Sequence, residues 1–348
     1  MLLRMISFAS VFAANMLSAQ AQETPPPLTP EAINGARLES IGPLSAPTPA
    51  PAPEADETDL AADPSEPAAL ARPEPAMIRL QVLLDRFGAS PGVIDGFDGD
   101  NVRKAVRAAE AMLGLPVDGE IDADLASRLQ SGDPVVGRYT ITPEDAADIV
   151  GPLPEDYSAL ARLDYLGYAS LREKLAERFH MDEDLLQTLN PGAGFVEGEA
   201  IIVAAYGPDL AGKVVHLEAD KAARQLRAYD AQGRMVVAYP ATIGSQDNPS
   251  PSGTHRVEAV APMPNYTYDP ENFVQGGNTS TLVLPPGPNG PVGSMWIDLS
   301  EPTYGIHGTP EPALIDKTSS HGCVRLTNWD AGELSTMVEP GVTVAFLN

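Results

Sequence analysis

The segment Ser319-Ser320-His321-Gly322-Cys323-Val324-Arg325-Leu326 contains the only cysteine in a chain of 348 residues. A cysteine attacks as its thiolate, yet an unassisted thiol is mostly protonated at neutral pH. An imidazole within hydrogen-bonding reach can take up that proton and hold a thiolate–imidazolium pair. Two histidines, His307 and His321, lie close to Cys323 in the sequence. The segment therefore predicts a nucleophilic thiol rather than a small buried side chain.

The glycine before the cysteine fits the same chemistry. Gly322 has no Cβ, so it permits a tight turn and lets a substrate carbonyl approach the backbone N–H groups. Such N–H groups are suited to hold the oxyanion of a tetrahedral intermediate. Zinc is an alternative, because the side chains of His307, His321 and Cys323 all bind it. No clear fourth ligand accompanies them, so we predict neither a metal nor a cofactor.

Around these segments apolar and polar residues alternate with a period of two, which is typical of strands. Strands are expected at residues 214–217, 225–229 and 234–239, with a hairpin turn at 230–233. Loops rich in Gly and Pro follow at 243–253 and 285–291, then a helix capped by Asn328 and a last strand at 342–347. Residues 213–348 are therefore predicted to form a mainly β, β-sandwich-like domain with its function on loops.

The pair His307-Gly308-Thr309 and 319–326 resembles the active-site signature of the YkuD-type L,D-transpeptidases, a family that includes the ErfK/YbiS/YcfS/YnhG proteins. The segments 239–244, 251–254 and 284–293 also resemble conserved parts of that family, so that the likeness extends over residues 213–348. The resemblance implies a cell-wall enzyme of the YkuD fold. Its substrates would be the stem peptides and glycan of peptidoglycan.

The resemblance also assigns roles to residues. Cys323 would attack the carbonyl of the third stem-peptide residue, release D-Ala and leave a thioester that an amine resolves into a 3-3 cross-link. His307 would be the base, oriented by the Gly308 carbonyl, and the N–H groups of Gly322 and Cys323 would form the oxyanion hole. The remaining candidates are His321 and Ser320 as shapers of the pocket, Arg325 as a partner of a substrate carboxylate or of a structural ion pair, and Tyr304 and Trp296 as groove residues, with a core role also open for Trp296.

The acceptor of the acyl group stays open, because relatives with different acceptors share the same motifs. The thioester could pass to a second stem peptide, to a wall-attached lipoprotein or to water, which would make the protein an L,D-carboxypeptidase or amidase. A function of another class, a non-catalytic wall-binding scaffold, is the remaining alternative. The oligomeric state is not indicated by the sequence.

The N-terminal part predicts export. Residues 1–21 resemble a signal peptide, with Arg4, an apolar run and a cleavage site at Ala19-Gln20-Ala21, although an uncleaved anchor is an alternative. Export implies a periplasmic, cell-wall-associated protein. The 22 basic and 48 acidic residues give a net charge of −26, which disfavours nucleic acid and anionic lipid as partners. Residues 22–76, rich in Pro and Ala, are predicted to be a disordered linker.

Two small units are expected between the linker and the β domain, which makes the chain a multidomain α+β protein. Residues 77–132 resemble a helical peptidoglycan-binding domain, with Asp-Gly turns at 95–96 and 118–119. The usual Phe-Gln of its second helix is replaced by Ala109-Glu110. Residues 139–206 resemble a degenerate LysM module, an α/β unit with helices near 170–179 and 182–189 and a closing strand near 200–203.

Overall fold

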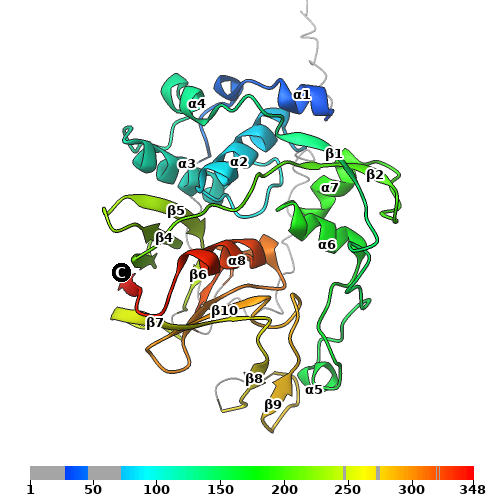
Figure 1. Ribbon diagram of the computed structural model, residues 1–348, viewed down its shortest axis with the longest axis vertical. Coiled ribbons are helices and arrows are strands. Elements are labelled where there is room, and N and C mark those ends of the chain that lie inside the picture. Colours follow the sequence, from blue (N-terminus) through cyan, green and yellow to red (C-terminus); the bar gives the residue numbers. More distant parts are fainter. Residues whose placement is uncertain (1–27, 46–71, 246–247, 272–274, 319, 321) are drawn as a thin grey trace, which may run out of the picture.

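The computed structural model describes residues 28–45, 72–245, 248–271, 275–318, 320 and 322–348. Helices gather in the N-terminal half of the chain and strands in the C-terminal half, which confirms the predicted mixed α+β class (Figure 1). Across the described part of the chain, no helix has both the length and the apolar character needed to cross a membrane. The predicted signal peptide, residues 1–21, lies outside the described residues.

The N-terminal half contains the following elements, in chain order: α1 (Pro30–Asn34), η1 (Leu38–Ser40), α2 (Pro75–Phe87), α3 (Asp100–Leu113), α4 (Ala123–Leu129), β1 (Val136–Thr140), α5 (Tyr157–Leu160), α6 (Leu171–Arg178), α7 (Glu183–Leu189) and β2 (Ala200–Ala204). Buried apolar side chains from Ile33 to Ala204 form one hydrophobic core, which also includes Ala238. The two predicted units, 77–132 and 139–206, therefore both contribute to this core.

Two buried polar side chains hold the two Asp-Gly turns of the helical unit. Gln81 Oε1, on α2, accepts hydrogen bonds from the backbone N–H groups of Gly96 (2.8 Å) and Asp95 (3.2 Å). Glu110, on α3, accepts from the N–H of Gly119 with both carboxylate oxygens, at 3.0 and 3.2 Å. Glu110 thus performs for the second turn what Gln81 performs for the first, which explains how this chain manages without the usual glutamine.

The prediction of a disordered linker is wrong for residues 28–45. Thr29 caps α1 by accepting a hydrogen bond from the N–H of Ala32 at 3.2 Å, and Ile33 and Leu38 are fully buried. The amide of Asn34 bonds the backbone of β1, accepting from the Val136 N–H at 3.0 Å and donating to its carbonyl at 3.0 Å. The average composition of 22–76 hid this short apolar cluster, which has enough buried surface to order the segment.

The LysM-like region has the two predicted helices, α6 and α7, and the predicted closing strand, β2. Its leading strand, β1, pairs with β2 in an antiparallel two-stranded sheet, and a long connection that contains α5 separates β1 from α6. The elements are present at the expected places. The assignment to the LysM family stays a prediction.

The C-terminal half contains β3 (His216–Asp220), β4 (Gln225–Tyr229), β5 (Met235–Pro240), β6 (Thr242–Ile243), β7 (Gly253–Pro262), β8 (Tyr266–Tyr268), β9 (Leu282–Leu284), β10 (Met295–Leu299), β11 (Gly305–His307), η2 (Pro312–Leu314), β12 (Val324–Arg325), α8 (Asn328–Met337) and β13 (Thr343–Leu347). Nine strands form one sheet in the order β5-β4-β3-β13-β7-β10-β11-β12-β6. The two halves of this sheet are continuous because β7 pairs with both β13 and β10, in place of the two separate sheets of a sandwich.

The helical half docks on the edge of this sheet and on the loop that leads to Cys323. Ala238, on the edge strand β5, donates to the carbonyl of Gly88 at 2.8 Å and accepts from the N–H of Ser90 at 2.9 Å. Lys104, on α3, pairs with Asp316 at 2.5 Å, seven residues before the cysteine. Helix α8 lies between the strands and the helical half, as Figure 1 shows, so that it contacts both.

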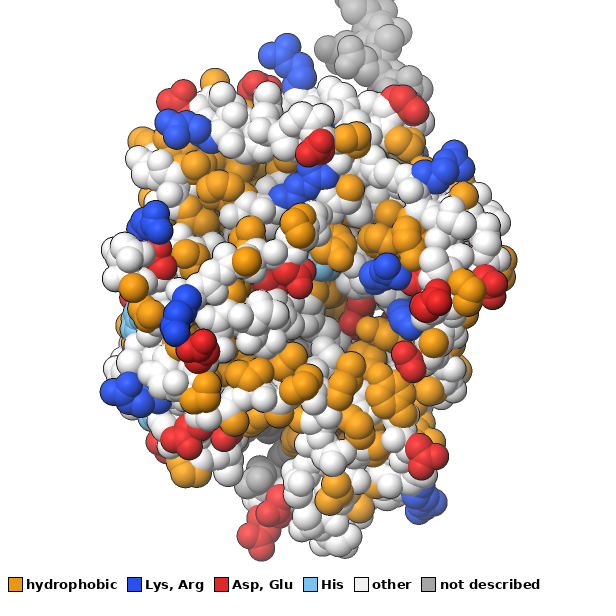
Figure 2. Space-filling model, viewed as in Figure 1, with side chains coloured by type: hydrophobic (Ala, Val, Ile, Leu, Met, Phe, Trp, Pro, Cys, Tyr) orange, Lys and Arg blue, Asp and Glu red, His pale blue; other side chains and the backbone are white. Residues whose placement is uncertain are grey.

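The surface drawn in Figure 2 carries charged side chains of both signs. On the face drawn in Figure 2, basic side chains lie singly, interspersed with acidic and apolar ones. Such a surface offers no concentrated positive field on that face for a polyanion to bind.

Candidate active site

The two predicted catalytic residues lie on, or directly next to, the neighbouring strands β11 and β12. These strands pair in parallel, with Ile306 opposite Val324 and His307 opposite Arg325. Ile306 and Val324 are fully buried in the core of the sheet. Because side chains alternate along a strand, His307 and Arg325 point to the other face. Cys323 directly precedes β12, and its thiol lies against the backbone of Gly305 on the neighbouring strand.

The imidazole of His307 is held in one orientation. Its Nδ1 bonds the carbonyl oxygen of Gly308 at 2.7 Å, and its ring stacks on Trp296 with 5.6 Å between ring centroids. A carbonyl only accepts hydrogen bonds, so Nδ1 must carry the proton. In the neutral ring, Nε2 is then left as the acceptor. This is the contact through which Gly308 was expected to act, and its orienting role stays a prediction.

Electrostatics favour a neutral pair at rest. Burial, followed by the positive charge of Arg325, lowers the pKa of His307 to about 3. Burial raises the pKa of Cys323 above its usual value. The thiol donates a weak hydrogen bond to the carbonyl of Thr303 at 3.8 Å. Both shifts disfavour the preformed thiolate–imidazolium pair that the sequence suggested.

Ser320 and Gly322 shape the loop around the thiol. Ser320 Oγ donates to the carbonyl of Cys323 at 2.7 Å and accepts from the N–H of Gly244 at 2.7 Å, which ties the loop to the end of β6. Gly322 has a φ of 104°, and a Cβ there would lie 2.6 Å from the Tyr304 ring. Only glycine fits both conditions. His321, predicted to share this loop, lies outside the described residues.

The remaining predicted residues lie around the same face. Trp296 is half-buried, and its ring covers Gly305 so closely that a Cβ on that glycine would be 2.5 Å away. The Trp296 ring therefore lies against one face of the His307 imidazole. Tyr304 donates to the carbonyl of Pro249 at 3.4 Å, across the loop from Gly322. Arg325 is half-buried next to His307, where its charge acts on the imidazole.

Sequence reasoning missed the residues that support the site from behind. Asn328 was expected to cap α8, but the cap is Thr327, whose hydroxyl accepts from the N–H of Asp330 at 3.0 Å. The Asn328 side chain instead packs on Gly308. Tyr266, on β8, is a further neighbour of the thiol, and burial followed by the thiol charge raises its pKa to about 12. No local pattern marks either residue.

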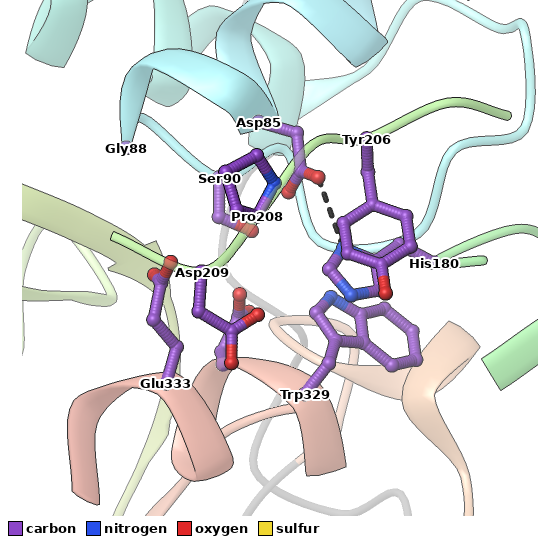
Figure 3. A pocket seen from close by; sticks show the side chains of 10 residues that line it. Asp85, Gly88, Ser90, His180, Tyr206, Pro208, Asp209, Trp329 and Glu333 are labelled. Carbon is purple, nitrogen blue, oxygen red and sulfur yellow. Dashed lines mark hydrogen bonds and ion pairs between the residues drawn. The ribbon is translucent and has the colours of Figure 1, made fainter. Parts of the chain in front are cut away.

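A second polar cluster lies apart from the thiol, at the contact between the two halves. Figure 3 shows the His180 ring between those of Tyr206 and Trp329, with centroids 4.0 and 5.1 Å away. Nδ1 of His180 bonds Asp85 at 2.9 Å. Asp330 is also buried here, and burial raises its pKa to about 8. This cluster joins α2, α8 and the segments after α6 and β2.

Comparisons with known proteins show to which family the chain is similar. The YkuD L,D-transpeptidase catalytic domain matches residues 215–345, and a peptidoglycan binding domain matches residues 73–129. The L,D-transpeptidase YkuD of Bacillus licheniformis is 31% identical over 177 residues, which cover 50% of this chain and 91% of that protein. YkuD of Bacillus subtilis is 28% identical, covering 49% of this chain and 89% of that protein. YbiS of Escherichia coli is 26% identical, covering 58% and 70%. This chain therefore belongs to the YkuD family of L,D-transpeptidases, with a peptidoglycan-binding domain in its N-terminal half.

Proposed function

We propose that this protein is a peptidoglycan L,D-transpeptidase whose nucleophile is Cys323 and whose base is His307. One observation carries the proposal: the hydrogen bond from Nδ1 to the Gly308 carbonyl leaves Nε2 of His307 as an acceptor, and the strand of His307 pairs with the strand that directly follows the only thiol. A neutral imidazole can accept a proton at the ring nitrogen that does not already carry one.

The reaction follows from these roles. Sγ bonds to the carbonyl carbon of the third stem-peptide residue while its proton passes to His307 Nε2. The oxyanion is held by the N–H groups of Gly322 and Cys323. The peptide C–N bond then breaks, D-Ala leaves with the proton from His307, and a thioester remains. An acceptor amine attacks the thioester, His307 removes its proton, and the thiol is restored as the new amide forms.

The substrate is peptidoglycan, for which the match to a binding domain at 73–129 is the support. We propose that Arg325 and Tyr304 contact the stem peptide and that His321 shapes the pocket. A protein with such a substrate acts in the cell envelope. We further propose that residues 1–21 direct export, that the protein is periplasmic, and that the LysM-like residues 139–206 bind glycan.

The decisive variant is Cys323→Ala, assayed for D-Ala release from a disaccharide tetrapeptide. We expect turnover to be abolished while the circular dichroism spectrum and the Tm stay as in the wild type. His216→Gln is a matched control, because His216 lies on β3 and bonds Thr343 at 2.8 Å, away from the thiol. Wild-type turnover in Cys323→Ala would exclude the proposed nucleophile.

The acceptor is decided by incubation with purified sacculi, followed by analysis of the muropeptides. We expect 3-3 cross-linked dimers. Trimmed stems would instead indicate water as the acceptor, and protein-bound stems would indicate a lipoprotein. A protein that binds sacculi without altering them would be the wall-binding scaffold.

A further inference from the structure

A buried carboxyl group from α6 reaches the back of the candidate active site. Glu177 is only 7% exposed and accepts hydrogen bonds from Asn328 Nδ2 at 3.0 and 3.3 Å. The same amide nitrogen donates to the carbonyl of Pro288 at 3.2 Å. Both hydrogens of the Asn328 amide are therefore used, by acceptors on Glu177 and Pro288. These two residues lie far apart in the sequence.

The other end of the same amide lies against the segment that orients the base. Asn328 Oδ1 accepts from the N–H of Ser294 at 3.0 Å, and a Cβ on Gly308 or Gly293 would lie 2.1 Å from that oxygen. Gly308 is the residue whose carbonyl holds His307 Nδ1. The contacts therefore run without a gap from Glu177 through Asn328 and Gly308 to the imidazole.

Further contacts from the LysM-like region fix the neighbouring loop at 286–290. Glu173 accepts from Asn289 Nδ2 at 2.5 Å, and Leu166 exchanges backbone hydrogen bonds with Pro286 (2.8 Å) and Asn289 (3.0 Å). A Cβ on Gly287 would lie 2.1 Å from the Leu166 carbonyl oxygen. The region around α6 is thus built into the back of the site.

We propose that Glu177 is a positioning residue for the reaction: by fixing the amide of Asn328, it holds Gly308 and thereby the orientation of His307. The proposal rests on the function proposed above, and it gives the LysM-like region a role in catalysis separate from binding glycan. Burial raises the pKa of Glu177 to about 8, so the group is mainly neutral at pH 7. Glutamine is therefore a close substitute for it, whereas alanine leaves the Asn328 amide without its partner.

The test compares Glu177→Ala, Glu177→Gln and the wild-type chain. We expect Glu177→Ala to lower kcat on the order of 10²-fold, because a small misplacement of a catalytic group has that effect, with KM nearly unchanged. Glu177→Gln should keep kcat within about threefold of the wild type. The matched control is Glu183→Ala on the adjacent helix, since Glu183 pairs with Arg172 at a half-exposed position and should leave kcat unchanged.

Two further readouts separate positioning from stability and do not need the substrate. The ¹⁵N resonance of His307 Nδ1 should shift in Glu177→Ala and return in Glu177→Gln, and the pH profile of iodoacetamide alkylation at Cys323 should change in parallel. The proposal would be overturned if Glu177→Ala had the kcat and the ¹⁵N resonance of the wild type. It would also be overturned if Glu177→Ala and Glu177→Gln lost kcat equally and in proportion to their loss of Tm. If the wild-type chain releases no D-Ala, the proposed function fails, and the resonance and alkylation profiles still decide the positioning role.

Discussion

Two mostly buried histidines, His307 in the candidate active site and His180 in the contact between the two halves, have opposite electrostatic surroundings. Burial and then Arg325 lower the pKa of His307 to about 3. Burial also lowers the pKa of His180, but the charge and hydrogen bond of Asp85 outweigh it, so that its pKa is raised. Burial acts in the same direction on both rings, so the opposite signs of their neighbouring charges, Arg325 and Asp85, explain why the two pKa values shift in opposite directions.

The two histidines also differ in which ring nitrogens and ring faces are occupied by neighbouring groups. His307 uses Nδ1 for the Gly308 carbonyl and stacks one face on Trp296. His180 has both ring faces covered, by Tyr206 and Trp329, and its Nδ1 is paired with Asp85 (Figure 3). A ring enclosed in this way stabilises a contact between elements, whereas the neutral ring of His307 keeps Nε2 as an acceptor.

The largest expected effect comes from exchanging each histidine. His307→Gln should lower the rate of D-Ala release by about 10²–10⁴-fold, the usual contribution of a general base. His180→Gln should retain most of the rate, because its contacts are structural. Steady-state kinetics on the disaccharide tetrapeptide measure both. If both variants are fully folded and the rate of D-Ala release falls equally in both, the two histidines do not differ in function as proposed.

A smaller loss should follow from disturbing the support of His307 without touching the ring. In Gly308→Ala, the new Cβ would meet Asn328 Oδ1 at 2.1 Å, so the segment must shift, and we expect kcat to fall by roughly 10²-fold. Gly332→Ala on α8 is the control, because nothing lies within 4 Å of its added Cβ. A Gly308→Ala variant as active as Gly332→Ala would show that the Gly308 segment tolerates displacement.

The smallest effects are changes in the pH dependence of stability, and their signs are opposite. The folded-state pKa of His307 is below its unfolded value, so its contribution is present above pH 6.5 and is lost as the pH falls towards 3. His180 has a raised pKa, so its contribution is present below pH 6.5 and is lost as the pH rises through the folded-state value. Tm profiles of His307→Gln and His180→Gln should therefore diverge from the wild type in opposite directions. Parallel profiles would contradict the assigned shifts.

The parts of the site that could be predicted are those that lie within short segments. The thiol, the nearby His307, the glycine at 322 and the alternating strands are all set by local spacing. The protonation state of the pair was not predictable, because it depends on how deeply β11 is buried and on Arg325 across the strand pair. For the same reason the lowered pKa of His307 and the raised pKa of Cys323, which disfavour the suggested thiolate–imidazolium pair, could not be predicted.

By itself, the sequence determined the candidate chemistry, because the proposed nucleophile, the proposed base and the glycine turn are indicated by residue type and by spacing along the chain. Only the tertiary structure decided what supports them. Glu177 and Asn328 are 151 residues apart, and the ordering of 28–45 depends on β1, about a hundred residues away. Contacts of that separation are selected by the packing of whole elements, and no local pattern encodes which buried polar groups will meet.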